Sequence, residues 1–464
     1  MLTQQQQASL KLPEVLSRKL AKQCARWYWL KDHPVQKKLV TDLYRFKCVP
    51  AGRRSGKTER FKRFMAYTCM ANADSLYFIA APTSGQVAKI YWKDMKDLSL
   101  SCLHSKPPSE TNKIIYFNNG TELHLCSLDK PDRIEGSPWS GGGIDEFAST
   151  KPDAWEKISP LFDTYDPLRP DYKPWCWFLG VPDGLNHYYE LCLQAETLKD
   201  WGVYAWPSAD ILPVDIIDAA KARMSAKQFR QEYEASFETV SGRIYEEYGK
   251  DNYTDSVILP HEQIHYFCDF NYTPMSHGIA VLRDSYTKVD TQKTIKSIYV
   301  LDEVILTSAE GHMNVSEFCD KYKTHKNKNI KLYGDASGKA GEKHSLDSEY
   351  TLMEAEFKRH GWIVDRCVKA ANPGIKDRQN CVNALIRNAL GVIRLYVNPE
   401  TAKYCHKGLS TVVFKTGSTF QEEQTKNKYQ HITTGLGYMC DYEFPIEYAH
   451  DFNSYKLTNI YGVA

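Results

Sequence analysis

The most constraining feature of the sequence is the run 51–58, Ala-Gly-Arg-Arg-Ser-Gly-Lys-Thr. It matches the phosphate-binding loop pattern, with alanine at the first position. An apolar strand pattern, 43–50, precedes this run and a helical pattern, 61–73, follows it, as such a loop requires. The backbone N–H groups of the loop and the N-terminus of the helix are therefore expected to face phosphate groups. A chance Gly-Lys-Thr in a turn is the alternative, which the strand–loop–helix context disfavours.

Two residues at the end of this loop carry the expected chemistry. Lys57 is predicted to bridge the β- and γ-phosphates of ATP, and Thr58 to hold Mg²⁺ through its hydroxyl. The candidate nucleotide-binding residues of the loop are Gly52, Arg53, Arg54, Ser55, Gly56, Lys57 and Thr58.

An acid pair, Asp145-Glu146, ends the apolar, glycine-led segment 141–144. Paired acids at the end of a strand suit a nucleotidase: Asp145 would orient the water shell of Mg²⁺, and Glu146 would activate the attacking water. Adjacent acids are also common on protein surfaces. Their place downstream of a phosphate-binding loop favours the catalytic interpretation.

Strand and helix patterns alternate through the first half of the chain. Further strands are predicted at 75–82 and 175–182, and 114–127 predicts a hairpin around Asn119-Gly120, the strongest short turn signal. The segment 14–32 has helical spacing. This alternation predicts a parallel α/β sheet.

The second half has a different order. The amphipathic helical segment 225–238 marks the expected domain junction. After it, three strand patterns follow one another before a helix, which predicts antiparallel pairing first. The predicted strands of this half are 265–272, 278–284, 297–305 and 330–337.

The bulk properties narrow the class of protein further. A chain of 464 residues exceeds one core and predicts two domains. No apolar run is long enough for a membrane helix, and the N-terminus lacks an apolar signal core. The thirteen cysteines include no CxxC pair, which disfavours structural zinc and favours reduced thiols. The formal net charge of +2 leaves DNA binding open, because acids elsewhere can balance a basic stripe.

A second acidic site is predicted in the C-terminal half. Asp269 lies in an apolar strand pattern and Asp335 ends another, and a buried carboxylate is costly unless it is paired or bound to metal. Oxygen ligands favour Mg²⁺ or Mn²⁺ over zinc. Each aspartate alone could instead be a strand-end cap or a turn former. Between them, Asp302-Glu303 offers a further carboxylate, with Glu303 inward if strand alternation turns Asp302 outward.

Several motifs of the first half occur together in a known family. GRRSGKT, SLYFIAAPTSGQVAKIYW, DRIEG shortly before GGGIDEF, and FLGVPDGLNHYYEL resemble, in order and spacing, the ATPase half of bacteriophage terminase large subunits over most of residues 33–205. The resemblance implies that Gln36 contacts adenine, that Arg53 senses the γ-phosphate and that Arg133 acts on a neighbouring subunit's ATP. It also implies that 180–184 couples hydrolysis to movement, although Val181 stands where the family has Ser or Thr.

The C-terminal half resembles the nuclease half of the same family, which has an RNase H-like fold. DFNYTP, with Asp269, resembles its first acidic motif and YGDASG, with Asp335, its second. The family's third acid stands a few residues after a histidine. Here His431 is followed by Thr434 at that position, so His431 or Asp441 is the alternative ligand. The implied metal ligands are Asp269, Asp335, Glu303 and His431. Lys339, Lys343 and His344 either contact the DNA backbone or belong to a solvated loop.

The expected fold class is α/β: a P-loop (RecA/ASCE-like) ATPase domain at 1–205, a helical linker at 206–245 and an RNase H-like nuclease domain at 246–464. The resemblance implies a viral packaging motor that uses ATP to translocate double-stranded DNA into a procapsid and cuts concatemers, with Mg²⁺ or Mn²⁺ in the nuclease. Implied partners are DNA, the portal protein, a small terminase subunit and copies of itself in a ring, with no membrane. The expected location is the host cell cytoplasm, at the procapsid portal, and not the mature virion.

Two other functions remain open at this point. One is a cellular helicase-like ATPase with an accessory nuclease, which would need helicase motifs that the sequence lacks. The other is an ATP-regulated DNA clamp with an inactive C-terminal domain, which the threonine at the third acid position supports.

Overall fold

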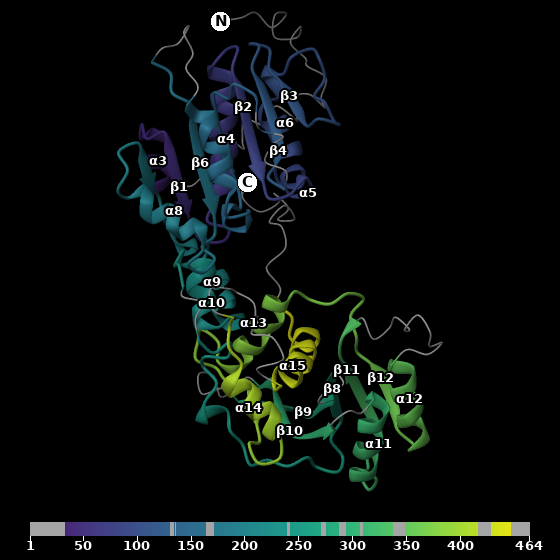
Figure 1. Ribbon diagram of the computed structural model, residues 1–464. Helices are drawn as coiled ribbons and strands as arrows, with labels where there is room; N and C mark the ends of the chain where they lie inside the picture. Colours follow the sequence, from purple (N-terminus) through teal and green to yellow (C-terminus); the bar gives the residue numbers. More distant parts are fainter. Residues whose placement is uncertain are drawn as a thin grey trace, which may run out of the picture. The chain divides into compact units, whose positions relative to one another are not determined.

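The computed structural model describes residues 33–129, 134, 136–163, 171–238, 242–270, 275–286, 294–306, 310–336, 349–415 and 428–446 (Figure 1). The predicted helix 14–32 and Arg133, Lys339, Lys343 and His344 lie outside these residues. The chain divides into two compact units. The first comprises 1–217 and 230–239, and the second 218–229 and 240–464.

The first unit is built on a seven-stranded sheet with the order β3-β4-β2-β5-β6-β1-β7. Its neighbouring strands run parallel except for the β3–β4 pair, which confirms the predicted parallel sheet and the hairpin. Its strands are β1 (Phe46–Pro50), β2 (Leu76–Ala81), β3 (Ile114–Tyr116), β4 (Glu122–Ser127), β5 (Gly141–Ile144), β6 (Trp175–Gly180) and β7 (Trp201–Val203). Gly120 in the hairpin turn has a φ of 83°, which a side chain would strain.

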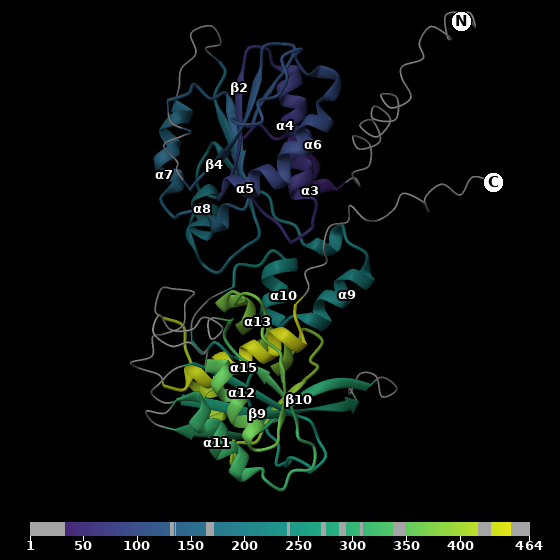
Figure 2. The ribbon, with the colours of Figure 1, turned by 90° about the vertical axis from the view of Figure 1, so that its right-hand side faces the viewer.

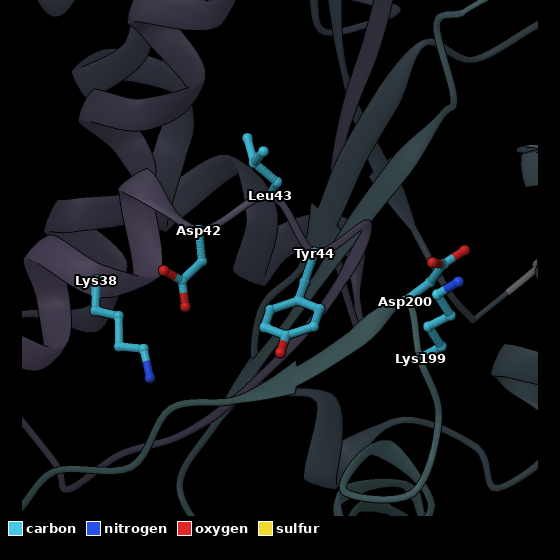
Figure 3. Close-up of a pocket in the computed structure, with 6 residues that line it drawn as sticks. All are labelled: Lys38, Asp42, Leu43, Tyr44, Lys199 and Asp200. Carbon is cyan, nitrogen blue, oxygen red and sulfur yellow. The ribbon is translucent and has the colours of Figure 1, made fainter.

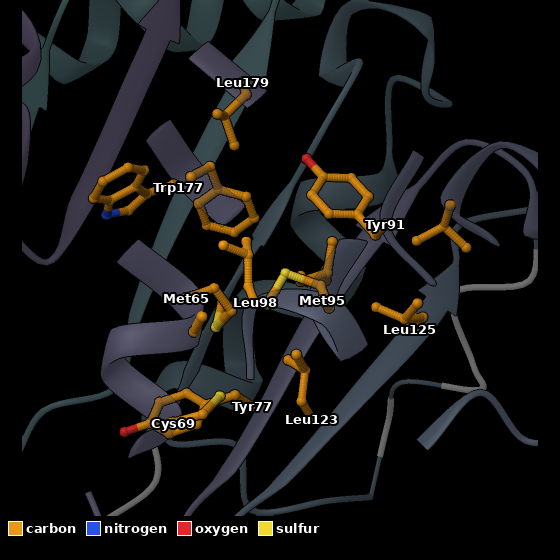
Figure 4. Close-up of a cluster of buried hydrophobic side chains, with 14 of the residues drawn as sticks. Met65, Cys69, Tyr77, Tyr91, Met95, Leu98, Leu123, Leu125, Trp177 and Leu179 are labelled. Carbon is orange, nitrogen blue, oxygen red and sulfur yellow. The ribbon is translucent and has the colours of Figure 1, made fainter. Parts of the chain in front are cut away.

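Helices cover both faces of this sheet (Figure 2). On one side lie α3 (Pro34–Thr41), α4 (Lys57–Ala71), α5 (Ser84–Val87), the π-helical turn η1 (Ala88–Trp92) and α6 (Lys93–Leu98); on the other lie α7 (Ala154–Ile158) and α8 (His187–Ala195). Consecutive strand residues divide between the two cores: Tyr77 packs with α4 and α6, and Phe78 with the opposite side. Figure 4 shows the first of these cores, with Met65, Met95 and Trp177 among its side chains.

The second unit holds a six-stranded sheet with the order β12-β11-β8-β9-β10-β13. As predicted, its first three strands pair antiparallel; β11 and β13 then add in parallel at β8 and β10. The strands are β8 (Ile264–Asp269), β9 (Met275–Tyr286), β10 (Thr294–Leu306), β11 (Asn329–Tyr333), β12 (Ile363–Arg366) and β13 (Leu395–Val397).

Helices also cover both faces of the second sheet (Figure 1). One face packs against α11 (Gly311–Lys321) and α12 (Glu349–Arg359), and the other against α13 (Ile375–Ile386), α14 (Lys403–Thr411) and α15 (Gln430–Glu443). The helix α15 contacts β8 and β9, the two central strands. It therefore covers the strand that ends in Asp269.

The segment 206–245 contains α9 (Val214–Arg223) and α10 (Ala226–Tyr233), and both helices are shared between the units. Residues 226–229 of α10 belong to the second unit and residues 230–233 to the first. That this segment acts as a linker stays a prediction.

Candidate functional site

The loop 51–56 joins β1 to α4 and is held in shape from several sides. Arg54 and Gly56 have φ angles of 59° and 84°, in the left-handed region. The buried carbonyl of Ser55 accepts hydrogen bonds from Gln36 Nε2 and Trp206 Nε1, both at 2.9 Å. At Gly52, a Cβ would lie 2.6 Å from the Tyr233 carbonyl oxygen, so only glycine fits. The loop is thus preorganised around the N-terminus of α4, as phosphate binding requires.

Thr58 and Asp145, predicted from separate motifs, meet in the structure. Thr58 Oγ1 donates a hydrogen bond of 3.0 Å to Asp145 Oδ2, and Asp145 is fully buried at the end of β5. A hydroxyl and a carboxylate are hard oxygen donors of the kind that Mg²⁺ takes, so this pair fits a magnesium ion beside the phosphates. The buried Tyr91, on the π-helical turn η1, also donates to Asp145 Oδ2, at 2.6 Å. Tyr91 was not identified from the sequence, where nothing local links it to Asp145.

Glu146 is next to Asp145 in a strained backbone conformation, with a φ of 53°. Such strain in a non-glycine residue costs about 1–3 kcal/mol and is common at functional sites. Burial raises the pKa of Glu146, and the nearby positive charges of Lys57 and Arg53 oppose that rise. The carboxylate predicted as the base therefore lies close to the loop lysine.

Arg53 is paired with a residue that sequence analysis missed. Its Nε lies 2.5 Å from Glu232 Oε2, and its backbone N–H donates to the Glu232 carbonyl at 2.6 Å. Glu232 lies on the part of α10 that belongs to the first unit. Only the three-dimensional structure brings these two residues together, because 179 positions separate them along the chain.

Gln36 is buried and braces the loop. Besides its bond to Ser55, its Oε1 accepts from Arg60 Nε at 3.2 Å. His33 caps α3 through Nδ1, and its Nε2 lies 2.9 Å from Asp210 Oδ2. Both ends of the Gln36 amide are therefore engaged with residues of the loop and α4; the predicted contact with adenine stays a prediction.

The predicted coupling segment 180–184 lies next to the loop. The Gly180 carbonyl at the end of β6 accepts from the Ala51 N–H at 3.1 Å. Gln231 of α10 then accepts from the Gly184 N–H at 3.2 Å. The helix that supplies Glu232 to Arg53 thus also contacts this segment.

In the second unit the two predicted aspartates follow neighbouring parallel strands, β8 and β11. Phe267 of β8 pairs with Tyr333 of β11 in parallel register, and continuing that register brings Asp269 level with Asp335. Neighbouring strands are about 4.8 Å apart. His431 Nδ1 lies 2.9 Å from Asp269 Oδ2, so His431 contacts one of the two aspartates.

Side-chain donors contact both oxygens of Asp335. Asn372 Nδ2 donates to Oδ1 at 2.7 Å, and the Tyr438 hydroxyl donates to Oδ2 at 3.0 Å. Neither Asn372 nor Tyr438 was identified from the sequence. Two carboxylates on adjacent strands suit Mg²⁺ or Mn²⁺ in donor type. Within the described part of the chain, however, no three His, Cys, Asp or Glu side chains gather as a metal-binding group.

Glu303 corrects the sequence analysis. Its carboxylate accepts hydrogen bonds from the backbone N–H groups of Tyr404, at 2.8 Å, and Cys405, at 3.1 Å. It caps the N-terminus of α14 instead of joining the two aspartates. Strand alternation does turn it away from Asp302, but β10 is two strands from β8, and Glu303 is level with Phe267 and not with Asp269.

A third carboxylate beside Asp269 and Asp335 is not supplied by Asp441, and Thr434 has none to offer. Asp441 is buried and forms an ion pair with Lys369. Thr434 lies on α15 between His431 and Tyr438, half-buried.

The hollow shown in Figure 3 is separate from both sites. It has a volume of about 520 Å³ and lies in the first unit. Its lining residues are Lys38, Asp42, Leu43, Tyr44, Lys199 and Asp200. None of them belongs to the loop 51–58 or the acid pair, so this hollow is not the candidate nucleotide site.

Among the described helices, none is both long and apolar enough to span a membrane.

Comparison with known proteins supports the fold and the resemblance. Residues 48–159 match the family model for the terminase large subunit, T4likevirus-type, N-terminal. The large terminase subunit of Escherichia phage T5 is 27% identical over 301 residues, which span 60% of this chain and 64% of the T5 protein. The predicted resemblance to bacteriophage large terminases is confirmed.

A similar fold is known from the large terminase of a thermophilic bacteriophage. The TM-score is 0.56 and the identity 16%, over 90% of this chain and 98% of that one. The same thermophilic protein in complex with ADP gives a TM-score of 0.55. The predicted fold class, an α/β chain of two domains like that of the large terminases, is likewise confirmed.

Proposed function

We propose that this chain, a relative of the bacteriophage terminase large subunits, is the ATP-hydrolysing motor that moves double-stranded DNA into a viral procapsid. We further propose that its second unit is a metal-dependent endodeoxyribonuclease that cuts concatemeric DNA. The observation that carries the motor function is the hydrogen bond between Thr58 and Asp145, beside Glu146. Two motifs far apart in sequence meet there as an ATPase needs.

The chemistry of the first site follows from its side chains. The N–H groups at the start of α4 and the Lys57 ammonium bind the phosphates. Mg²⁺, when held by Thr58 and Asp145, offsets phosphate charge. Water attacks the γ-phosphorus while Glu146 takes its proton and ADP leaves. The raised pKa of Glu146 suits this role, because a base works best when its pKa approaches the operating pH.

In the second unit, Asp269 and Asp335 would hold Mg²⁺ or Mn²⁺. The ion would supply charge stabilisation of the phosphodiester and a more acidic bound water. His431 orients Asp269, while Asn372 and Tyr438 orient Asp335. Asp269 and Asp335 belong to a different unit from the phosphate-binding loop, so DNA cleavage is expected without ATP.

DNA-stimulated ATP hydrolysis and packaging of linear DNA into purified procapsids test the motor function. We expect DNA to raise the ATPase rate and packaged DNA to become resistant to added DNase. ATP hydrolysis that neither DNA nor procapsids stimulate, with no protected DNA, would overturn the motor assignment.

A second candidate function is an ATP-regulated DNA clamp with structural acids in the second unit. It is favoured by the absence of a third carboxylate beside Asp269 and Asp335 in the described residues. Nicking of supercoiled plasmid with Mn²⁺ separates the two functions: a nuclease nicks, and a clamp only shifts the plasmid in a gel.

The partners and location form part of the same proposal. They are double-stranded DNA, a portal protein, a small terminase subunit and further copies of the chain in a ring on the portal, in the host cell cytoplasm and not in the mature virion. The relation to large terminases supports them. Co-sedimentation of the chain with portal-bearing procapsids, with and without a nucleotide, tests the portal contact.

A further inference from the structure

The helix α15 presents one of its sides to the two aspartates of the second unit. His431 and Tyr438 are seven residues apart, so they lie on the same side of the helix, about two turns from each other. His431 contacts Asp269 at 2.9 Å and Tyr438 contacts Asp335 at 3.0 Å. One helix therefore meets both acids.

A glycine lets this helix come close to the acid-bearing strand. A Cβ at Gly435 would lie 3.0 Å from the Cys268 carbonyl carbon and 3.2 Å from its Cα and oxygen. Cys268 immediately precedes Asp269. No side chain at position 435 separates α15 from β8, so His431 and Tyr438 reach the acids directly.

Tyr438 is held on its other side by Arg378 of α13. The Arg378 guanidinium lies 4.3 Å from the centre of the Tyr438 ring. The stem of Arg378 packs on Gly437, where a Cβ would come within 3.2 Å of the Arg378 Cβ. A second glycine of α15 thus makes room for this arginine.

Burial of the Arg378 side chain costs free energy of folding. It is 9% exposed, and its Nε and Nη1 are buried with no hydrogen-bond partner among the described residues. Unpaired buried donors of a charged group cost more than stacking on an aromatic ring returns. Packing alone would favour an apolar side chain here. The guanidinium instead places a positive charge over the ring of Tyr438, whose hydroxyl contacts Asp335.

We propose that Tyr438, held by Arg378, is a positioning residue of the C-terminal acidic site, acting through its contact with Asp335. This inference rests on the proposed nuclease function. The Tyr438 hydroxyl fixes one oxygen of Asp335 while Asn372 fixes the other. The carboxylate is thereby oriented for a divalent cation without a third negative charge, and Arg378 stabilises the phenol in that position.

The test is Mn²⁺ binding by the full-length chain, measured by titration calorimetry, with Tyr438→Phe and Arg378→Met. Tyr438→Phe keeps the ring over Arg378 and removes only the hydroxyl. We expect each variant to bind Mn²⁺ about threefold to tenfold more weakly, with a thermal midpoint in EDTA close to that of the original chain. Because the two residues act through each other, the double variant should be no weaker than the weaker single variant.

Tyr442→Phe is the matched control, one turn further along α15, and should bind Mn²⁺ as the original chain does. Unchanged Mn²⁺ affinity in Tyr438→Phe, while the original chain binds Mn²⁺ and nicks DNA, would overturn the inference alone. Lost affinity accompanied by a large drop in the thermal midpoint of both single variants would also overturn it, because the role would then be structural. If the original chain neither binds Mn²⁺ nor nicks DNA, the nuclease function itself fails and the inference with it.

Discussion

Arg53 of the phosphate-binding loop and Glu232 of α10 form an ion pair, with Arg53 Nε 2.5 Å from Glu232 Oε2. The Glu232 side chain is largely buried, and its charge also acts on Glu146. An incoming triphosphate would thus compete with Glu232 for Arg53.

Removing the charge of Glu232 should therefore tighten nucleotide binding. In Glu232→Gln, Arg53 is released and one negative charge near the phosphates is lost. We expect the dissociation constant for a fluorescent ATP analogue to fall by about threefold to tenfold, since charge-assisted contacts contribute roughly 1 kcal/mol or more. Glu234→Gln, two positions along and exposed, serves as the control. Weaker binding in Glu232→Gln would instead show that the ion pair supports the loop.

Replacing Glu146 by Gln should stop turnover and spare binding. The amide cannot take a proton from water, so steady-state ATP hydrolysis should slow by at least about 10²-fold. The fluorescent analogue should still bind. Glu156→Gln, an exposed acid of the same unit, should hydrolyse ATP at the original rate. Hydrolysis that survives Glu146→Gln would assign the base to another residue.

Removing metal ions should distinguish DNA nicking, proposed for the second unit, from ATP hydrolysis, proposed for the first. EDTA should abolish plasmid nicking, and Mg²⁺ or Mn²⁺ should restore it in the original chain. Neither ion should restore nicking in Asp269→Asn or Asp335→Asn, whose ATP hydrolysis in Mg²⁺ should stay near the original rate. Asp284→Asn changes an exposed acid on β9 and should nick normally. Nicking by either site variant would exclude that aspartate as an essential ligand.

The pH dependence of stability should carry a contribution from Glu303. Burial raises the pKa of this carboxyl from 4.5 to about 7, against the backbone N–H groups of Tyr404 and Cys405, which favour the charged form. A raised folded pKa means that the contribution is fully present below pH 4.5 and is lost as the pH rises through about 7.

Urea unfolding of the original chain and Glu303→Gln at pH 4.5, 6 and 8 measures this contribution. The free energy of unfolding of the original chain, relative to the variant, should fall by roughly 3 kcal/mol between the extremes, from a shift of more than two pKa units. A difference that does not change with pH would mean that folding leaves the pKa of Glu303 unshifted.

The close approach of α15 to β8 should make Gly435 sensitive. A methyl group there would press on the Cys268 backbone at 3.0–3.2 Å, so the helix must move by a few tenths of an ångström. Gly435→Ala should cost about 1–3 kcal/mol of stability, as overpacking of a core does. At Gly249, in the same unit, a Cβ would meet nothing within 4 Å, so Gly249→Ala should be nearly neutral. Equal midpoints for the two variants would contradict this packing.

The sequence predicted the parts of the fold that local pattern determines. The loop 51–58, the hairpin at Asn119-Gly120 and the strands around Asp269 and Asp335 each have a short-range signature. The meeting of Thr58 with Asp145 could also be anticipated, because the ends of parallel strands share one edge of a sheet.

The remaining site residues have no such signature. Glu232 was visible only as a charge on an amphipathic helix, and nothing local links it to Arg53. Tyr438 escaped because a search for a third ligand looks for a carboxylate and not for a phenol. Glu303 shows the opposite failure: alternation identifies the face of a strand that a side chain occupies, but not how many strands lie between it and its expected partners.

Because α10 is shared between the two units, it determines how the chain can be cut into fragments. The chain passes from one unit to the other at 217/218, 229/230 and 239/240. No single peptide bond therefore divides it into two whole units: a cut after 217 leaves Glu232, which belongs to the first unit, on the C-terminal fragment, and a cut after 239 leaves 218–229, which belong to the second unit, on the N-terminal fragment. A protease or a gene truncation would always produce one piece with a missing segment. A fragment meant to hold one whole unit must therefore be joined from two separate stretches of the chain, 1–217 with 230–239 or 218–229 with 240–464.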